Sequence, residues 1–237
     1  MHSNLAALDA VLADAGSIDE VWCLGDFVGY GPDPNEVLER LRALPLKAVA
    51  GNHDYGCVGK ADVALFNQDA RRACEWTSTV LTDDARSYLT ALDAQGVFRD
   101  IYVAHGSPRD PVWEYITNIR TAQANFGYFG TSVCLVGHTH MPIVFRWRSG
   151  VSGVAAFVAD VPEPGSDIFV GADRLIINPG SVGQPRDGVP LAAYAIYDPE
   201  TKVFQFRRAA YDIGRTQARM REVGLPDRLS TRLQYGW

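Results

Sequence analysis

Short apolar segments that end abruptly in glycine and polar side chains constrain this chain more than any other feature. Each segment has the length and composition of a buried strand. The polar residues that follow are Asp26 after residues 21–24, Asn52-His53-Asp54 after 47–50, His105 after 101–104, and His138-Thr139-His140 after 133–136. Because ligands bind at the carboxyl ends of strands in α/β sheets, four such loops are predicted to meet at one site.

The histidines strengthen this prediction. The chain has five, and each lies at a predicted strand end or directly before a helix; they are His2, His53, His105, His138 and His140. Taken alone, Asp26 would be a cap and His105 a structural residue, but scatter would not produce the whole set. Imidazole and carboxylate ligands without cysteine suit zinc, iron, manganese or nickel. The pattern therefore predicts a transition-metal site.

Helical and strand segments alternate in the first half of the chain, and the second half is rich in strands. Helices are expected at residues 5–15, 34–43, 67–81, 83–92 and 212–223, the last of which closes the ordered part. Further strands are expected at 143–148, 153–158, 168–170, 174–177, 192–197 and 203–208. This order predicts a single layered α/β domain over residues 1–237 with two sheets.

Composition excludes several classes of function. The 22 basic and 28 acidic residues give a net charge of −6, which argues against a broad nucleic-acid surface. No apolar stretch approaches the roughly 20 residues of a membrane span, and the N-terminus does not resemble a signal peptide. The four cysteines are scattered and form no C-x-x-C pair, so we expect no zinc ribbon or redox motif. A cytoplasmic protein with reduced thiols is expected.

The polar motifs, in their order and spacing, resemble those of the calcineurin-like metallophosphoesterases. The motifs are Gly25-Asp26, Gly51-Asn52-His53-Asp54, His105 after a strand, and Gly137-His138-Thr139-His140. The stretches at residues 25–36 and 178–186 are similar to the small bacterial and archaeal phosphodiesterase branch of that family. The resemblance covers nearly the whole chain.

The resemblance implies a four-layer α-β-β-α sandwich, in which two mixed sheets pack face to face with helices outside. It also implies two divalent ions of manganese, iron, zinc or nickel. Asp26 would bridge both ions, His2 and His140 would bind the first, and Asn52, His105 and His138 would bind the second. A metal-bridging hydroxide would attack phosphorus in line. His53 would bind no metal; it would face the substrate phosphate, together with Asn52, as a general acid or charge stabiliser.

Two departures from the family pattern qualify this picture. The first motif of the family is Asp-x-His; His2 matches its last position, and the Asp with its apolar strand would fall before Met1. We expect these residues to exist upstream and a gap in the core where that strand would lie; a true truncation with a weakened first metal site is the alternative. The second departure is Gly29-Tyr30-Gly31, which stands where phosphoprotein phosphatases carry Arg-Gly, so protein phosphatase activity is disfavoured.

Two further residues are candidates for the site. The Asp that partners the equivalent of His53 in protein phosphatases is missing, and Asp54 is the nearest replacement as a catalytic residue. Arg186 could meet a substrate phosphate, or it could be a solvated loop arginine. Aromatic residues at 113–115 and 126–129 could line a cleft, a dimer contact or the core.

Three functions remain open. The first is a metal-dependent phosphodiesterase acting on a small or nucleotide-like phosphoester, and the second is a nucleotide pyrophosphohydrolase acting on dinucleoside polyphosphates. The third is a non-catalytic scaffold with a structural metal site. A membrane partner is not expected, and a homo-oligomer is possible on this sequence.

Overall fold

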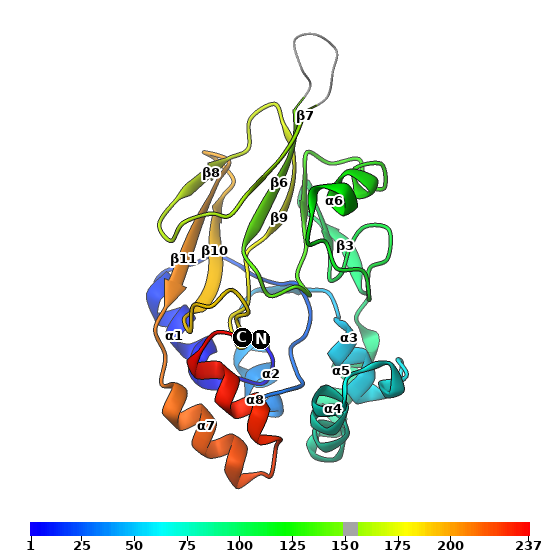
Figure 1. Cartoon of the computed structure of the whole chain (residues 1–237), viewed down its shortest axis with the longest axis vertical. Helices are drawn as coiled ribbons and strands as arrows, with labels where there is room; N and C mark the ends of the chain where they lie inside the picture. The colour runs from blue at the N-terminus through cyan, green and yellow to red at the C-terminus, as the bar shows by residue number, and fades with distance from the viewer. Residues whose placement is uncertain (149–155) are drawn as a thin grey trace.

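The computed structural model describes residues 1–148 and 156–237, and its largest sheet has six strands in the order β3-β4-β5-β9-β6-β7 (Figure 1). They are β3 (Gln95–Phe98), β4 (Ile101–Ala104), β5 (Val133–Leu135), β9 (Arg174–Asn178), β6 (Ile143–Arg148) and β7 (Ala156–Asp160). Strands β4, β5 and β9 run parallel, so the loops after β4 and β5 leave the same edge of the sheet. The first part of the strand predicted at 153–158 lies outside the described residues.

Two smaller sheets complete the β-structure. One is antiparallel, with β10 (Ala192–Asp198), β11 (Val203–Ala209) and β8 (Asp167–Phe169) in that order. The other is the parallel pair of β1 (Val21–Cys23) and β2 (Leu46–Ala48). Among the described strands, no pairing joins β1 to β10, so three sheets are present where two were expected.

Side chains alternate across the large sheet and build a core on each face. One face meets β11 in a core that includes Val103, Leu135, Ile177, Phe204 and Phe206. The opposite face packs on the region of α6 (Ile119–Asn125), where Phe126 lies against Cys134 and Ile176. These two cores come from alternate residues of β5 and β9, as the pleat requires.

Helix α1 (Leu5–Ala15) covers the outer face of the small antiparallel sheet, because Ala7 and Val11 pack against Ala192 and Ala209. The order from α6 through the two facing sheets to α1 has four layers. The structure thus confirms the predicted class of mixed sheets between helices. In the aromatic segment at 126–129, Phe126 and Phe129 are buried in the core, whereas Tyr128 is exposed.

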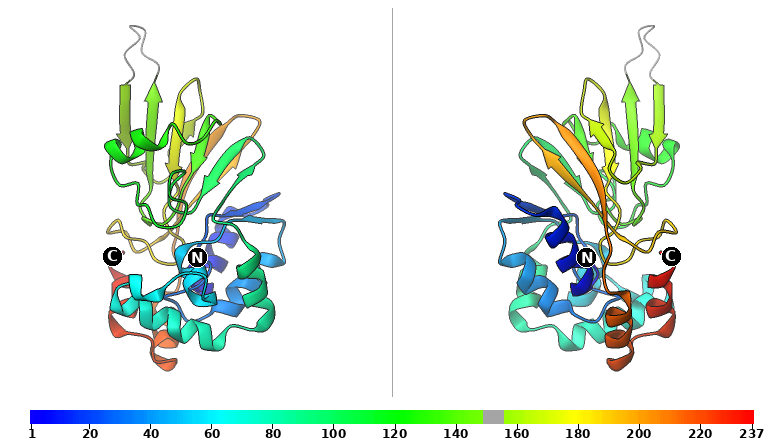
Figure 2. Two further views of the ribbon diagram at one scale, coloured as in Figure 1. Left: turned by 90° about the vertical axis from the view of Figure 1, so that its right-hand side faces the viewer. Right: turned by 90° about the vertical axis from the view of Figure 1, so that its left-hand side faces the viewer.

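The remaining helices gather at the other end of the molecule, below the six-stranded and three-stranded sheets in Figures 1 and 2. They are α2 (Pro34–Arg42), α3 (Asn52–Val58), α4 (Gln68–Val80), α5 (Asp83–Ala91), α7 (Ile213–Glu222) and α8 (Asp227–Thr231). Helices α3, α6 and α8 and strand β3 were not predicted from the sequence. The ordered part was expected to end at 223, but Leu225, Leu229 and Leu233 are buried against Tyr30 and Met220. Within residues 1–148 and 156–237, no helix is long and apolar enough to cross a membrane.

A cavity of about 440 Å³ lies between β1 and β10. Its walls include Val21 and Cys23 on one side and Tyr194 and Ile196 on the other, and Met1 also lines it. Among the described strands, β1 pairs only with β2 and β10 pairs only with β11. The gap predicted in the core is therefore present, and it separates the edges of two sheets.

Two valines on neighbouring strands provide a test of this core. Val103 in β4 is fully buried, whereas Val97 in β3 is 58% exposed. Val103→Ala should lower the free energy of unfolding by about 2 kcal/mol, because it removes two buried methyl groups and leaves a cavity. Val97→Ala should change it by less than about 0.5 kcal/mol. Urea denaturation of both variants checks this, and equal losses would contradict the assigned orientation of the sheet.

Candidate metal centre

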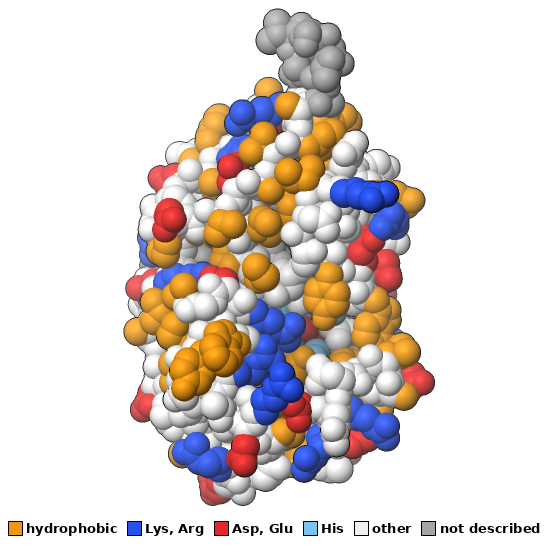
Figure 3. All heavy atoms as spheres, viewed as in Figure 1, with side chains coloured by type: hydrophobic (Ala, Val, Ile, Leu, Met, Phe, Trp, Pro, Cys, Tyr) orange, Lys and Arg blue, Asp and Glu red, His pale blue; other side chains and the backbone are white. Residues whose placement is uncertain are grey.

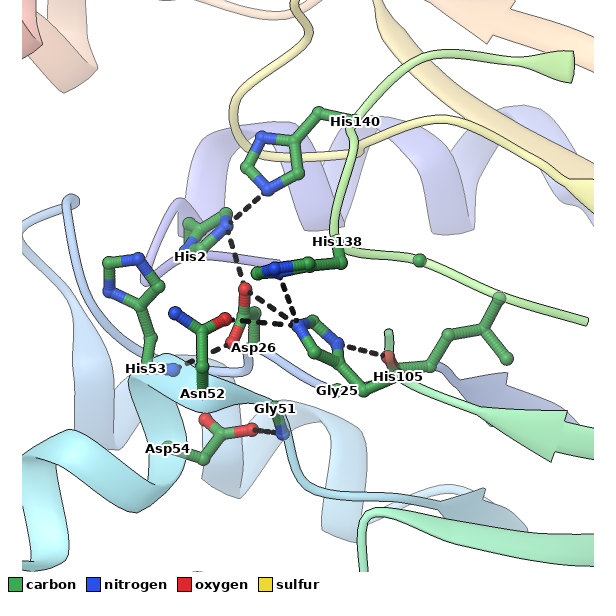
Figure 4. A network of polar contacts seen from close by, with 12 residues as sticks. His2, Gly25, Asp26, Gly51, Asn52, His53, Asp54, His105, His138 and His140 are labelled. Atoms are coloured by element: carbon green, nitrogen blue, oxygen red, sulfur yellow. Dashed lines mark hydrogen bonds and ion pairs between the residues drawn. The ribbon is translucent and has the colours of Figure 1, made fainter. Parts of the chain in front are cut away.

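The six side chains predicted as metal ligands meet where the strands end (Figure 4). Asp26 follows β1, Asn52 begins α3, His105 follows β4, His138 and His140 follow β5, and His2 precedes α1. Each is at most 5% exposed. Residues that lie far apart in the sequence, from His2 to His140, thus share one buried cluster.

The backbone at this cluster is strained. His2, Asp26, His138 and His140 all have positive φ, between 53° and 63°. A residue other than glycine held in this region costs about 1 kcal/mol or more. Gly51 permits the closest approach, because a Cβ there would lie 2.1 Å from Asp26 Oδ1. The surrounding structure therefore holds these side chains in positions that the isolated loops would not favour.

In four histidines of the cluster, the ring nitrogen that points away from Asp26 (the outer nitrogen) is hydrogen-bonded to a backbone carbonyl. These bonds determine the tautomer of each ring. His2 Nδ1 donates to Val28 O, His105 Nδ1 to Leu24 O, His138 Nε2 to Trp113 O and His140 Nδ1 to Gln184 O, at 2.7–3.2 Å. A carbonyl oxygen only accepts, so each outer nitrogen carries the hydrogen. In a neutral imidazole the inner nitrogen is then a bare lone pair.

The inner atoms lie very close together. His2 Nε2 is 2.8 Å from His140 Nε2, and His105 Nε2 is 3.1 Å from both His138 Nδ1 and Asn52 Oδ1. Asp26 Oδ2 lies 3.4 Å from His2 Nε2 and 3.3 Å from His105 Nε2, and it has no hydrogen-bond partner. Burying such groups without a partner is unfavourable.

A cation would resolve this conflict. Ligand atoms held about 2.1 Å from one metal ion are themselves about 3.0–3.5 Å apart, and the inner atoms lie 2.8–3.4 Å apart, close to that spacing. Hydrogen bonds from the outer ring nitrogens to carbonyls are also the usual support for metal-binding histidines. Two groups could each hold a divalent cation: His2, Asp26 and His140, and Asp26, His105 and His138. Asp26 belongs to both groups, and Asn52 Oδ1 lies beside the second.

The charge state of the cluster agrees with metal binding. Burial keeps the pKa of His2 and His140 well below the usual value and lowers that of His138 to about 3, so these three rings are neutral. Burial opposes ionisation of both Asp26 and His105, but their mutual attraction outweighs it, holding the pKa of Asp26 well below and that of His105 above the usual value. Asp26 is further fixed because the His53 backbone N–H donates to Oδ1 at 2.9 Å.

His53 lies beside the cluster, outside both candidate metal groups (Figure 4). Its ring is 5.0 Å from the His2 ring and 4.2 Å from the Tyr30 ring, measured between centroids. Its Nδ1 is 3.3 Å from the Cys74 Sγ in α4. Burial disfavours the charged ring, but Tyr30, Cys74 and Asp26 outweigh it and raise the pKa of His53 to about 10. The contact from Cys57, and then the charge of His53, lower the pKa of the Cys74 thiol to about 5.

Asp54 has a different partner from the one expected. Its Oδ1 accepts a hydrogen bond from Val28 N at 3.1 Å, and its Oδ2 accepts one from Gly51 N at 2.9 Å. The expectation that Asp54 would partner the His53 ring is therefore wrong, because both of its oxygens bind backbone N–H groups. It joins the loop after β1 to the start of α3. Cys74 occupies the position next to the ring. It could not be predicted from the sequence, because it lies 21 residues from His53 on another helix.

Arg186 lies near the His2 and His140 side of the cluster. Figure 3 shows basic side chains gathered beside a visible histidine on one face of the molecule. The guanidinium of Arg186 donates to Tyr30 Oη at 3.2 Å and to Gln184 Oε1 at 2.8 Å. Its charge contributes to the lowered pKa of His2 and His140, so it faces that side of the cluster. Tyr115, in one of the aromatic segments singled out above, stacks on the His138 ring at 3.8 Å and is 48% exposed.

Comparison with known proteins identifies the family. The model of the calcineurin-like phosphoesterase superfamily domain matches residues 1–202. The chain belongs to the calcineurin-like phosphoesterases. It is therefore a phosphoric ester hydrolase of a family that uses divalent metals, as the sequence predicted, rather than a non-catalytic scaffold.

Three similar proteins span nearly the same length as this phosphoesterase. A metallophosphoesterase from Sphaerobacter thermophilus is 48% identical with a TM-score of 0.89, over 100% of this chain and 96% of that one. An uncharacterised protein of Methanocaldococcus jannaschii is 35% identical, over 100% of this chain and 95% of its own. A hypothetical protein from Pyrococcus horikoshii OT3 shares the fold, with 21% identity and a TM-score of 0.78 over 100% and 95% of the two chains.

Cation binding by this phosphoesterase should depend on Asp26 and not on the His53 ring. Asp26→Ala removes the carboxylate that both groups share, so Mn²⁺ affinity should fall by more than about 100-fold, beyond the loss typical of a supporting residue. His53→Gln is the matched control, since it changes an adjacent buried ring outside both groups. Equilibrium dialysis with elemental analysis measures the difference. A similar loss in both variants would count against the assigned groups.

Proposed function

We propose that this chain is a phosphodiesterase whose site binds two divalent cations that share Asp26. The observation that carries the proposal is the pair of candidate groups with that one carboxylate in common. His2 and His140 would complete the first cation site, and Asn52, His105 and His138 the second. The carbonyl oxygen of Asn52 suits this role, because it is a neutral ligand 3.1 Å from His105 Nε2. Manganese, iron, zinc and nickel are all compatible with these donors.

Bound divalent cations would supply Lewis-acid activation of water and positive charge for the oxygens of the phosphoryl group. The protein would do the rest. Asp26 is held in place by the His53 N–H, and the histidines by backbone carbonyls, so the ligands require little reorganisation. Their tautomers are likewise set before substrate arrives.

His53 is the group that can move a proton. Its Nδ1 contacts Cys74, and no hydrogen bond to its Nε2 occurs among the described residues. We assign Nε2 the donation of a proton to the leaving oxygen, which would otherwise depart as an alkoxide. The raised pKa of His53 is consistent with a ring that carries a proton near neutral pH.

Arg186 is assigned to the non-bridging oxygens of the substrate. Tyr30 and Gln184 hold its side chain on the side of His2 and His140. A diester carries one negative charge at neutral pH and a monoester nearly two. One guanidinium beside the cations fits the diester, and the proposed substrate is a small or nucleotide-like ester.

The substrate preference is tested with a pair of aryl esters. With Mn²⁺ present, bis(p-nitrophenyl) phosphate should be hydrolysed with a higher kcat/KM than p-nitrophenyl phosphate, and EDTA should abolish both activities. His53→Ala should lower kcat on the diester by about 10²–10⁴-fold, the usual contribution of a general acid. Faster hydrolysis of the monoester would overturn the diester preference. Preferential release of nucleoside phosphates from a dinucleoside polyphosphate would favour the pyrophosphohydrolase.

The role of Arg186 is tested separately. Arg186→Ala should lower kcat/KM on the diester by about 10–100-fold, because a charge-assisted hydrogen bond to phosphate is worth about 1.5–3 kcal/mol. Arg120→Ala on the exposed surface of α6 removes the same side chain away from the site and should leave kcat/KM unchanged. Steady-state kinetics on both variants measures this. Unchanged kcat/KM in Arg186→Ala would return this residue to the role of a solvated loop arginine.

A further inference from the structure

The His53 ring is confined on several sides. A Cβ at Gly29 would lie 2.4 Å from His53 Nδ1, so the backbone of that loop lies directly against the ring. The Tyr30 ring is 4.2 Å away and the Phe66 ring 4.9 Å away, between centroids. The side chain is 3% exposed. The ring position is therefore fixed by its neighbours, and what matters next is which groups its two nitrogens contact.

Cys74 contacts one of the two nitrogens, Nδ1. Its Sγ lies 3.3 Å from His53 Nδ1, within hydrogen-bonding distance for sulfur, and the thiol is 1% exposed. Both oxygens of Asp54, the acidic neighbour, are taken by backbone N–H groups. The sulfur is thus the polar side-chain atom that meets this end of the ring.

We propose that Cys74 is a positioning residue, whose thiol holds His53 Nδ1 so that the proton available for the leaving group resides on Nε2. The inference rests on the proposed function, in which His53 Nε2 donates that proton. Cys74 itself touches neither substrate nor metal. It acts through the ring of His53.

The proton arrangement follows from the two states of the pair. If the thiol donates to Nδ1, that nitrogen is an acceptor and the ring hydrogen is on Nε2. If the proton has passed from sulfur to the ring, Nδ1–H donates to the thiolate and Nε2 still carries a hydrogen. In both states Nε2 is the donor. After donation to the leaving oxygen, the pair has lost one proton, and solvent restores it before the next turnover.

The surroundings explain why a thiol can serve here. Cys74 belongs to the apolar core that also holds Phe27, Cys57 and Leu89. A carboxylate in that core would lose its hydration, whereas a buried cysteine behaves as a small apolar group with a weak donor. Helix α4 fixes the sulfur in place, since its N-cap Asn67 accepts from Ala70 N and the helix packs on α3, which carries His53.

The test uses methyl aryl phosphodiesters whose leaving groups are p-nitrophenol or unsubstituted phenol, assayed with Mn²⁺ on the full chain. The unsubstituted phenol is the poorer leaving group and needs the proton more. Cys74→Ala should lower kcat about tenfold on the phenyl ester and distinctly less on the p-nitrophenyl ester, with KM changed less than twofold. Cys74→Ser keeps a donor and should recover most of the rate. Mn²⁺ content should equal that of the wild type.

Cys134→Ala is the matched control, since it deletes a buried thiol in β5 that lies in a different core. Its leaving-group dependence should equal that of the wild type, and thermal denaturation reports whether either alanine variant is less stable. In the His53→Ala background, Cys74→Ala should cause no further loss, because the ring through which it acts is gone.

The outcomes separate the two proposals. Wild-type kinetics in Cys74→Ala, together with a slow His53→Ala, would overturn the positioning role and leave the function of His53 intact. A loss that is equal for both esters and persists in the His53→Ala background would also overturn it, as a purely structural effect. Wild-type activity in His53→Ala would remove the proposed role of His53, and with it the role of Cys74.

Discussion

The whole site depends on one arrangement: lone pairs of buried histidines point at Asp26 while their N–H groups point at backbone carbonyls. The carbonyls of Leu24, Val28 and Gln184 are parts of the loops that follow strands or flank the cluster. Each ring is thereby fixed in tautomer and direction at once. Because bare acceptors repel one another in an apolar interior, bound cations would offset this repulsion, and their binding would also stabilise the fold.

The fold provides the place where this arrangement is possible. Parallel β4 and β5 end at one edge of the large sheet, and β1 ends against them, which brings His105, His138 and Asp26 together. The positive φ values at four site residues show that ordinary loop conformations would aim these side chains elsewhere. Layers of packed side chains on both faces of the sheet supply the rigidity that holds such strain.

The sequence allowed the residues that meet in the cluster to be predicted better than their surroundings. Polar residues directly after apolar segments locate His105, His138 and His140, because strand ends and ligand sites coincide. The start of α3 was missed, since its Gly-Asn-His-Asp motif has no apolar periodicity. The described strands form three sheets and not two, because the edges of β1 and β10 face a cavity and do not pair. Asp54 was misread because its proximity in sequence to His53 does not determine where its carboxylate points, and Cys74 joins the site only through the packing of α4 on α3.

The candidate histidine ligands and the proposed proton donor are thus positioned by different parts of the molecule. Strand ends and backbone carbonyls orient these histidines, whereas His53 sits on α3 and contacts Cys74 on α4. Substitutions on the inner face of α4 can alter the His53 ring without touching any atom of the cation groups. Activity toward poor leaving groups can therefore change while metal affinity stays constant. In this fold the packing of α4 on α3 positions the proposed proton donor, whereas the loops at the edge of the large sheet position the candidate cation ligands His105, His138 and His140.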